Sequence, residues 1–149
     1  MSKMADFYSS IYDRFNYDRF LKLAELFELN IKKPIANFSK GMKRQASIIL
    51  ALSTRAKYMF FDETFDGLDP VMRNLVKKLI CNDVAEYDTT VIVTSHSLRE
   101  LEDICDHLAL LHKGGLVLDS DVLELKTTQF KVQIAFKGIF GKPSLKDST

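Results

Sequence analysis

Four apolar residues run directly into two adjacent carboxylates in the segment Tyr58-Met59-Phe60-Phe61-Asp62-Glu63. A glycine-containing turn and a proline follow at once, in Thr64-Phe65-Asp66-Gly67-Leu68-Asp69-Pro70. A short apolar run bounded by turn residues predicts a strand buried on both faces, as in the parallel sheets of α/β domains. Open α/β sheets bind ligands beyond the carboxyl ends of such strands, so Asp62 and Glu63 are candidate site residues. The structural alternative is that Asp62 caps a turn and Glu63 is solvated.

The residues that follow predict a strand–helix–strand unit. Asp69 and Pro70 are typical of an N-cap and a first helical residue, for a helix that ends near residue 87. The β-branched run at 90–94 predicts a second buried strand, parallel to the first. The helix between them is expected to bury the apolar residues Val71, Met72, Leu75, Val76, Leu79 and Ile80.

Three helices are expected before the first strand. Bulky apolar residues at helical spacing predict helices over 1–16 and 17–29. Ser39 is a suitable N-cap for a third helix that runs to about residue 55. A helix N-terminus beside Lys40 and Lys43 is a natural anion site, although a capped surface helix explains the same residues.

The remaining third of the chain is expected to contain shorter elements. They are a helix after Ser95-His96-Ser97, a strand at 107–112, a hairpin turn at Gly114-Gly115, an antiparallel strand at 116–118, a helix at 121–126, a strand at 130–136 and a tail at 138–149. Cys81 and Cys105 form no C-x-x-C pair and are read as free, buried thiols in a reducing compartment.

Composition indicates one ordinary globular domain of 149 residues, with 46% hydrophobic and 28% charged residues. The net charge of +1 gives no field for steering nucleic acid, so no nucleic-acid partner is expected. No apolar run is long enough to span a bilayer, and no signal peptide is recognised. A cytoplasmic protein that docks on a membrane protein is expected.

Four motifs stand in one order, and together they resemble the ATP-binding subunits of ABC transporters over roughly residues 1–126. F-S-K-G-M at 38–42 resembles the signature motif, and Y-M-F-F-D-E at 58–63 resembles the Walker B strand. G-L-D-P at 67–70 resembles the D-loop, and V-T-S-H at 93–96 resembles the switch-histidine strand. The resemblance implies a partial P-loop NTPase fold of the α/β class, with a mostly parallel sheet and an N-terminal helical subdomain.

The same resemblance implies three parts of the chain. Residues 1–40 would be the helical subdomain that faces the membrane subunits, and 41–126 the C-terminal part of the ATPase core. Residues 127–149 would form a C-terminal strand and tail.

The resemblance also implies roles at the ends of the two strands. Asp62 would hold Mg²⁺, Glu63 would polarise the attacking water, and His96 would contact the γ-phosphate of ATP. Such parts suit phosphoryl transfer, which needs positioning and charge neutralisation. A satisfied strand-end histidine is the structural alternative for His96.

Five further residues would bind a nucleotide held by a second ATP-binding subunit or lie at that dimer interface. They are Ser39, Lys40, Gly41 and Met42 of the signature motif and Asp69 of the D-loop. For Asp69 a plain N-cap is the alternative. The implied partners are that second subunit and transmembrane permease subunits, with the protein at the inner face of the cell membrane.

The sequence also departs from the family pattern. Lys40 and Met42 replace the usual Gly and Gln of the signature, a form that resembles exporters linked to drug, lipid or antibiotic-peptide resistance. Thr64, Phe65 and Asp66 replace P-T-S, which puts the dimer contact of Phe65 in question. None of the six glycines begins the phosphate-loop pattern G-x-x-x-x-G-K-[ST].

This last departure leads to the expectation that the chain is a fragment, inactive alone, whose sheet lacks strands beside the 58–61 strand and leaves apolar edges uncovered. The alternative is a nucleotide-independent interaction module that keeps the membrane-subunit docking surface. A DNA-repair or chromosome ATPase head shares the motifs, but the chain has no heptad run.

Overall fold

The structure is a computed structural model that describes residues 1–128. Its contacts group the chain into two compact units that divide between Cys105 and Asp106. The first unit is built from α1 (Ser2–Ile11), α2 (Tyr17–Leu26), the 3-10 turn η1 (Ile35–Asn37), α3 (Lys40–Ser53), β1 (Tyr58–Asp62), α4 (Pro70–Tyr87), β2 (Thr90–Thr94) and α5 (Leu98–Glu102). The described part of the second unit contains β3 (His107–His112), β4 (Gly115–Asp121) and α6 (Val122–Thr128).

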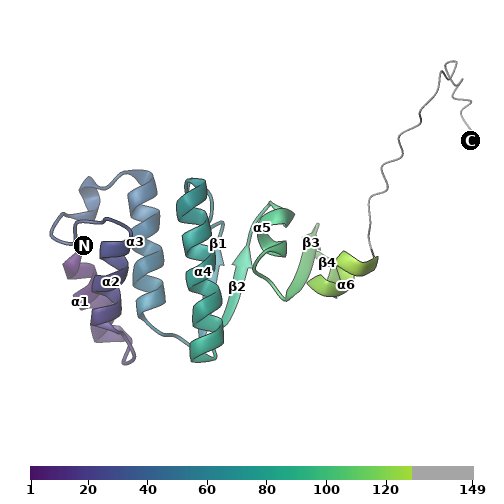
Figure 1. The fold of residues 1–149 in the computed structure, drawn as a ribbon, viewed down its shortest axis with the longest axis horizontal. Helices are drawn as coiled ribbons and strands as arrows, with labels where there is room; N and C mark the ends of the chain where they lie inside the picture. Colours follow the sequence, from purple (N-terminus) through teal and green to yellow (C-terminus); the bar gives the residue numbers. More distant parts are fainter. Residues whose placement is uncertain (129–149) are drawn as a thin grey trace, which may run out of the picture. The chain divides into compact units, whose positions relative to one another are not determined.

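The first unit has the predicted α/β architecture. Strands β1 and β2 pair in parallel, with Tyr58 opposite Thr90 and Asp62 opposite Thr94. Helix α4 connects them, so the three elements form a βαβ unit. Within this unit α3 stands between α2 and α4 (Figure 1).

One hydrophobic core joins the N-terminal helices to α3, β1 and α4. Its most buried large side chains include Phe20 of α2, Ile49 and Leu52 of α3, and Val76 of α4, each with no more than 2% of its surface exposed. Burying an aliphatic or aromatic side chain of this size stabilises a fold by about 1.5–3 kcal/mol, so these contacts fix α3 against its neighbours.

The predicted N-caps of α3 and α4 are both present. The Ser39 side chain accepts a hydrogen bond from Met42 N at 3.2 Å, and α3 begins at the next residue. The Asp69 carboxylate accepts from Val71 N and Met72 N, each at 3.0 Å, and Pro70 is the first residue of α4. These local bonds satisfy amides that have no intrahelical acceptor.

The prediction that β1 is buried on both faces is wrong. Met59 and Phe61 are buried, whereas Phe60 is 74% exposed and Tyr58 is 60% exposed. Ile92 lies opposite Phe60 on the same face of the strand pair and is also exposed. The described strands pair only with each other in this unit, and the helices pack on one face, so the other face stays open. The sequence placed the uncovered apolar surface at the edges of the sheet, whereas these exposed side chains lie on one of its faces.

Helix α4 differs from its predicted apolar face at one position. Val76 and Ile80 are buried, but Val71 is 74% exposed. Val71 lies in the first turn on the solvent side of the helix, whereas the next residue, Met72, packs against the core. Phe65 in the preceding turn is buried instead, with 1% of its surface exposed.

The second unit confirms the predicted hairpin and short helix. Strands β3 and β4 pair antiparallel, with His107 opposite Asp121 and His112 opposite Gly115. The turn lies at Lys113 and Gly114, whose φ angles of 49° and 79° are both left-handed, and not at the predicted Gly114-Gly115. A two-residue hairpin turn of this kind matches the twist of the strands.

The remaining predictions concern the two cysteines, the C-terminal segments, the division of the chain and membrane-spanning helices. Both cysteines are free, as expected, but Cys81 is exposed and Cys105 is half-buried, so the expectation of buried thiols is wrong. The predicted strand at 130–136 and tail at 138–149 lie outside the described residues. The three-part division of the chain at residues 40 and 126 stays a prediction. Among the described helices, none has both the length and the apolar character needed to cross a bilayer.

Candidate functional site

The candidate site lies where β1 and β2 end, because parallel strands bring their carboxyl ends to one edge. Thr94 closes this edge with two hydrogen bonds across the strand pair. Its hydroxyl donates to Asp62 Oδ1 at 2.5 Å and accepts from the amide of Glu63 at 3.1 Å. Asp62 and Glu63 are therefore held at the rim where the sequence predicted them, and Thr94, to which sequence analysis gave no role, positions both.

Glu63 and His96 meet directly at this rim. His96 Nδ1 lies 3.0 Å from Glu63 Oε2, and the imidazole and carboxylate are 72% and 41% exposed. Glu63 has a φ angle of 46°, a left-handed conformation that costs a non-glycine residue about 1–3 kcal/mol. This backbone conformation turns the chain out of β1 at the residue that contacts His96.

The contact changes the titration of the imidazole. The hydrogen bond to Glu63, followed by the negative charge of Glu63, raises the pKa of His96 above its ordinary value of 6.5. The charge of Asp66 acts in the same direction more weakly. The site therefore favours a protonated His96 beside two carboxylates.

The N-terminus of α3 approaches the same turn. Arg44 reaches from the second turn of α3, and its guanidinium donates to the carbonyl of Glu63 and, at 2.9 Å, to that of Asp66. Lys40 and Gly41 line a hollow of about 330 Å³ together with Arg44, Asp66 and Gly67. A Cβ added at Gly41 would lie 3.7 Å from the carbonyl of Gly67, so the turn passes close to the helix start.

The structure thus brings two of the four predicted signature residues, Lys40 and Gly41, to the hollow beside the turn. Ser39 and Met42 are joined to each other by the N-cap hydrogen bond. The carboxylate of Asp69, in contrast, accepts hydrogen bonds from the first amides of α4. It therefore acts as the N-cap of this helix, which was the structural alternative for this residue. Arg44 was not singled out in the sequence, although its place four residues after Lys40, on one face of the helix, was readable.

Phe65, the most unusual departure from the family pattern, is a core residue in this chain. Its ring is buried, and Lys77 Nζ lies 5.7 Å from the ring centre. Its side chain is therefore directed into the core of its own unit.

One group of potential metal ligands is found among the described residues. Donor atoms of Glu63, Asp66 and His96 all lie within 4.8 Å of one another. Asp62, the residue predicted to hold Mg²⁺, is outside this group and contacts Thr94. The role of Asp62 stays a prediction.

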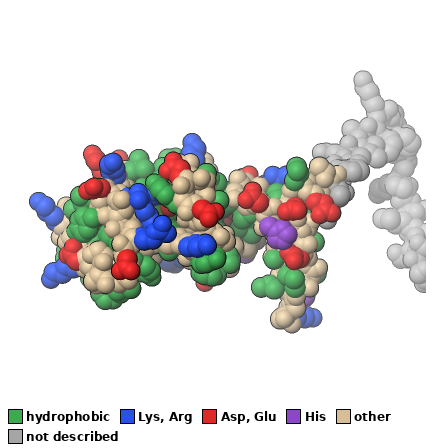
Figure 2. Space-filling view, turned by 90° about the horizontal axis from the view of Figure 1, so that it is seen from below, with side chains coloured by type: hydrophobic (Ala, Val, Ile, Leu, Met, Phe, Trp, Pro, Cys, Tyr) green, Lys and Arg blue, Asp and Glu red, His purple; other side chains and the backbone are tan. Residues whose placement is uncertain are grey.

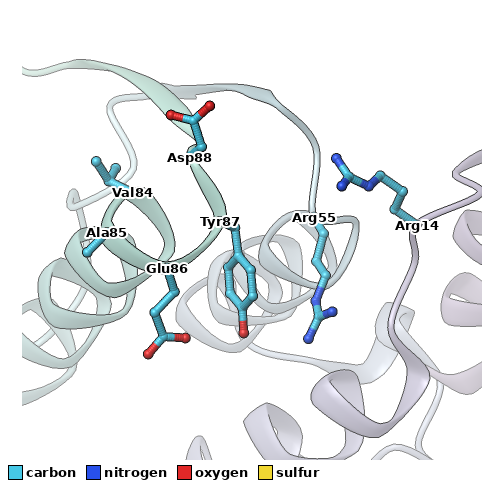
Figure 3. A pocket seen from close by; sticks show the side chains of 7 residues that line it. All are labelled: Arg14, Arg55, Val84, Ala85, Glu86, Tyr87 and Asp88. Carbon is cyan, nitrogen blue, oxygen red and sulfur yellow. The ribbon is translucent and has the colours of Figure 1, made fainter.

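A second, larger hollow of the first unit lies away from this site. A cavity of about 690 Å³ is lined by Arg14, Arg55 and the last residues of α4, from Val84 to the C-cap Asp88 (Figure 3). The guanidinium of Arg55 lies 4.6 Å from the centre of the Tyr87 ring. Since α4 has 18 residues, at about 1.5 Å per residue its two ends are ~27 Å apart, and this cavity is remote from Glu63.

The described residues carry charges of both signs on the face drawn in Figure 2. On the face seen in Figure 2, basic and acidic side chains are interspersed with hydrophobic ones. This mixture agrees with the net charge of +1.

Comparison with known proteins gives the class. The family model described as "AAA domain, putative AbiEii toxin, Type IV TA system" matches residues 13–102. A solved "ATP binding subunit of ABC transporter" superposes with a TM-score of 0.69 and 26% identity, over 74% of this chain and 47% of that chain. A cobalt transport ATP-binding protein superposes with a TM-score of 0.61 at 22% identity, which shows the shared fold.

Similar sequences agree with this class. The ABC transporter ATP-binding protein YtrB of Bacillus subtilis is 33% identical over 134 residues, which are 90% of this chain and 46% of YtrB. The bacitracin transport ATP-binding protein BcrA of Enterococcus faecalis is 31% identical, over 68% of this chain and 34% of BcrA.

The fold is the P-loop NTPase fold of the ATP-binding subunits of ABC transporters. The chain belongs to the AAA-domain family of the matching model, and its similar sequences and solved structures are ATP-binding proteins of ABC transporters. It covers 46% of YtrB and 34% of BcrA, so it spans less than half the length of either relative.

Proposed function

We propose that this chain supplies the hydrolytic half of an ATP-binding subunit that powers an ABC transporter. The contact of Glu63 with His96, at the carboxyl ends of two parallel strands, carries this proposal. A carboxylate at this rim can orient an attacking water and the imidazole can hold that carboxylate in place, which suits phosphoryl transfer because this reaction depends on positioning and charge neutralisation.

The residues present fit one side of a bound ATP and Mg²⁺. The first amides of α3 are free of intrahelical acceptors, and Lys40 and Arg44 add positive charge at the hollow. Asp62 presents a carboxylate oxygen at the strand end, which is the donor type that Mg²⁺ prefers. Mg²⁺ would neutralise charge on the phosphates, and Asp62 would hold it there.

The remaining proposed roles rest on the likeness to ABC transporter ATP-binding proteins. Glu63 would orient the attacking water, and its contact with His96 would hold the carboxylate in one direction. Ser39, Gly41 and their neighbours Lys40 and Met42 would contact the γ-phosphate of a nucleotide bound by a second subunit. In this proposal Asp69 caps α4 and reaches that subunit interface from the turn.

The proposed partners are a second ATP-binding subunit and transmembrane permease subunits, at the cytoplasmic face of the membrane. Exposed apolar side chains on the N-terminal helices support a docking surface of this kind. They include Phe7 and Ile11 of α1, each 55% exposed, and Leu26 of α2, 49% exposed. The alternative function, a nucleotide-independent module, would use the same surface without hydrolysis.

The 149-residue chain by itself is proposed to bind ATP weakly and to lack turnover, because its sequence contains no phosphate-loop pattern. The direct experiment joins residues 1–128 to the portion of YtrB that this chain does not match, and measures phosphate release. Hydrolysis by the joined protein, with none by the chain alone, supports the proposal. Joined protein that folds and binds ATP without hydrolysing it favours the nucleotide-independent module.

A further inference from the structure

Two clusters in the described chain combine one histidine with two acidic residues, and they differ in how the donor atoms are arranged. In the second unit Asp119 contacts Nε2 of His107, while Asp121 contacts Nδ1 of the same ring at 3.3 Å. The two carboxylates therefore lie at opposite nitrogens, and no ring atom faces both.

The cluster in the first unit has the converging arrangement. One donor atom each from Glu63, Asp66 and His96 lies within 4.8 Å of the other two. In a tetrahedral zinc site the ligand atoms lie about 3.3 Å apart, as follows from zinc–ligand distances of ~2.0–2.2 Å. The exposed side chains of Asp66 and His96 can close this gap by small rotations, since neither is packed in the core.

The backbone that carries these donors is fixed by contacts outside the cluster. The guanidinium of Arg44 holds the carbonyls at both ends of the turn from Glu63 to Asp66. Burial of Phe65 anchors the middle of the same turn. His96 follows β2, which is paired residue by residue with β1. The donors are thus presented by a defined backbone before any ion binds.

The donor set selects among metals. Imidazole nitrogen with two carboxylate oxygens suits zinc and similar transition metals, whereas Mg²⁺ prefers an all-oxygen shell with several waters. We propose that Glu63, Asp66 and His96 form a site for a divalent transition metal of the zinc type, with water as the fourth ligand. This site is separate from Asp62, to which the Mg²⁺ role is assigned, and it does not require ATP.

The test is calorimetric titration of ZnCl₂ into the full 149-residue chain, without nucleotide and with excess MgCl₂. One zinc per chain is expected. His96→Ala and Asp66→Ser should each weaken zinc binding at least about tenfold. Loss of a residue that only supports a metal ligand already costs about 10–100-fold in affinity, so loss of a ligand itself should cost at least as much. Asp66→Ser changes an exposed side chain, so it keeps the test valid if His96→Ala disturbs the fold.

The matched control is His107→Ala, which removes the other histidine that lies between two carboxylates. Zinc binding should be unchanged in this variant. The proposal is overturned if the chain binds no zinc under these conditions, or if binding survives both His96→Ala and Asp66→Ser. Loss of binding in His107→Ala alone would also overturn it. Because no ATP is present, these outcomes are independent of whether the chain contributes to hydrolysis.

Discussion

His96 and Glu63 lie 33 residues apart in the chain, yet Nδ1 of one is 3.0 Å from Oε2 of the other. The parallel register of β1 and β2 creates this contact, because it brings the residues after Asp62 and after Thr94 to one edge. The βαβ unit is therefore sufficient to assemble the imidazole–carboxylate pair, without any element from the second unit.

The first prediction concerns the protonation of His96. Since Glu63 raises the pKa of His96, the imidazole should titrate above 6.5, and Glu63→Gln should lower its midpoint. The stabilising contact is fully present below the unfolded value and is lost as the pH rises through the raised folded value. NMR titration of the ring protons measures this, and equal midpoints in both proteins would contradict it.

The hairpin of the second unit offers a parallel prediction. The hydrogen bonds to Asp119 and Asp121 raise the pKa of His107, so the β3–β4 hairpin should be most protected when this histidine is protonated. Amide exchange of β3, corrected for its intrinsic pH dependence, should lose protection as the pH rises through the raised pKa. Asp119→Asn should reduce this pH dependence, whereas Glu63→Gln should leave it unchanged.

The third prediction uses two phenylalanines five residues apart. Phe65→Ala should lower the free energy of unfolding of the first unit by about 3–5 kcal/mol, because it empties a fully buried site. Phe60→Ala is the control, since that ring is 74% exposed and little apolar contact is lost. Urea denaturation measures both, and equal effects would show that Phe65 is not a core residue.

The fourth prediction concerns the buried ion pair between α2 and α4. Asp83 is 1% exposed and pairs with Arg19, and burial raises the pKa of Asp83 although Arg19 opposes this shift. Asp83→Ala should cost about 3–5 kcal/mol, because it leaves the guanidinium buried without its partner. Glu86→Gln, on the same helix but exposed, should change stability little.

A double substitution to apolar residues distinguishes two causes of the lost stability: loss of the Arg19–Asp83 attraction and burial of one unpaired charge. Arg19→Met combined with Asp83→Leu should recover most of the loss caused by Asp83→Ala, since neither charge remains to be buried. Thermal or urea unfolding of the three variants gives the comparison. A double variant as unstable as the single one would mean that the pair itself, and not burial of a lone charge, supplies the stability.

Much of the fold could be predicted because its signals are local. Ser39 caps α3 and Asp69 caps α4 through bonds to amides two or three residues away, and such bonds follow from residue type and position. The β-branched run at 90–94 has the same local character. The order of these elements then required a parallel pair of strands.

The errors arose where burial depends on distant partners. Phe60 was expected inside because parallel strands usually have both faces covered, but the described helices cover only one face of β1. Cys81 was expected inside for a similar reason and is exposed on α4. Apolar character alone does not say which face of an element a neighbour will reach.

The candidate site divides in the same way. The acids and His96 were found from their places after two strands. Thr94 and Arg44 were not, because their contacts with Asp62, Glu63 and Asp66 depend on how strand ends and helix meet in space. The left-handed φ angle of Glu63 could not be predicted from the sequence either, because glutamate rarely adopts this conformation.

The most direct test of the central claim is ATP hydrolysis by the joined protein, compared with its Glu63→Gln variant. The glutamine keeps the size of the side chain but can no longer polarise the water. The account predicts that the variant binds ATP and forms ATP-bound dimers while phosphate release falls to background. Phosphate release by the variant at the unsubstituted rate would contradict the role of Glu63 and the assignment of the rim as a hydrolytic site.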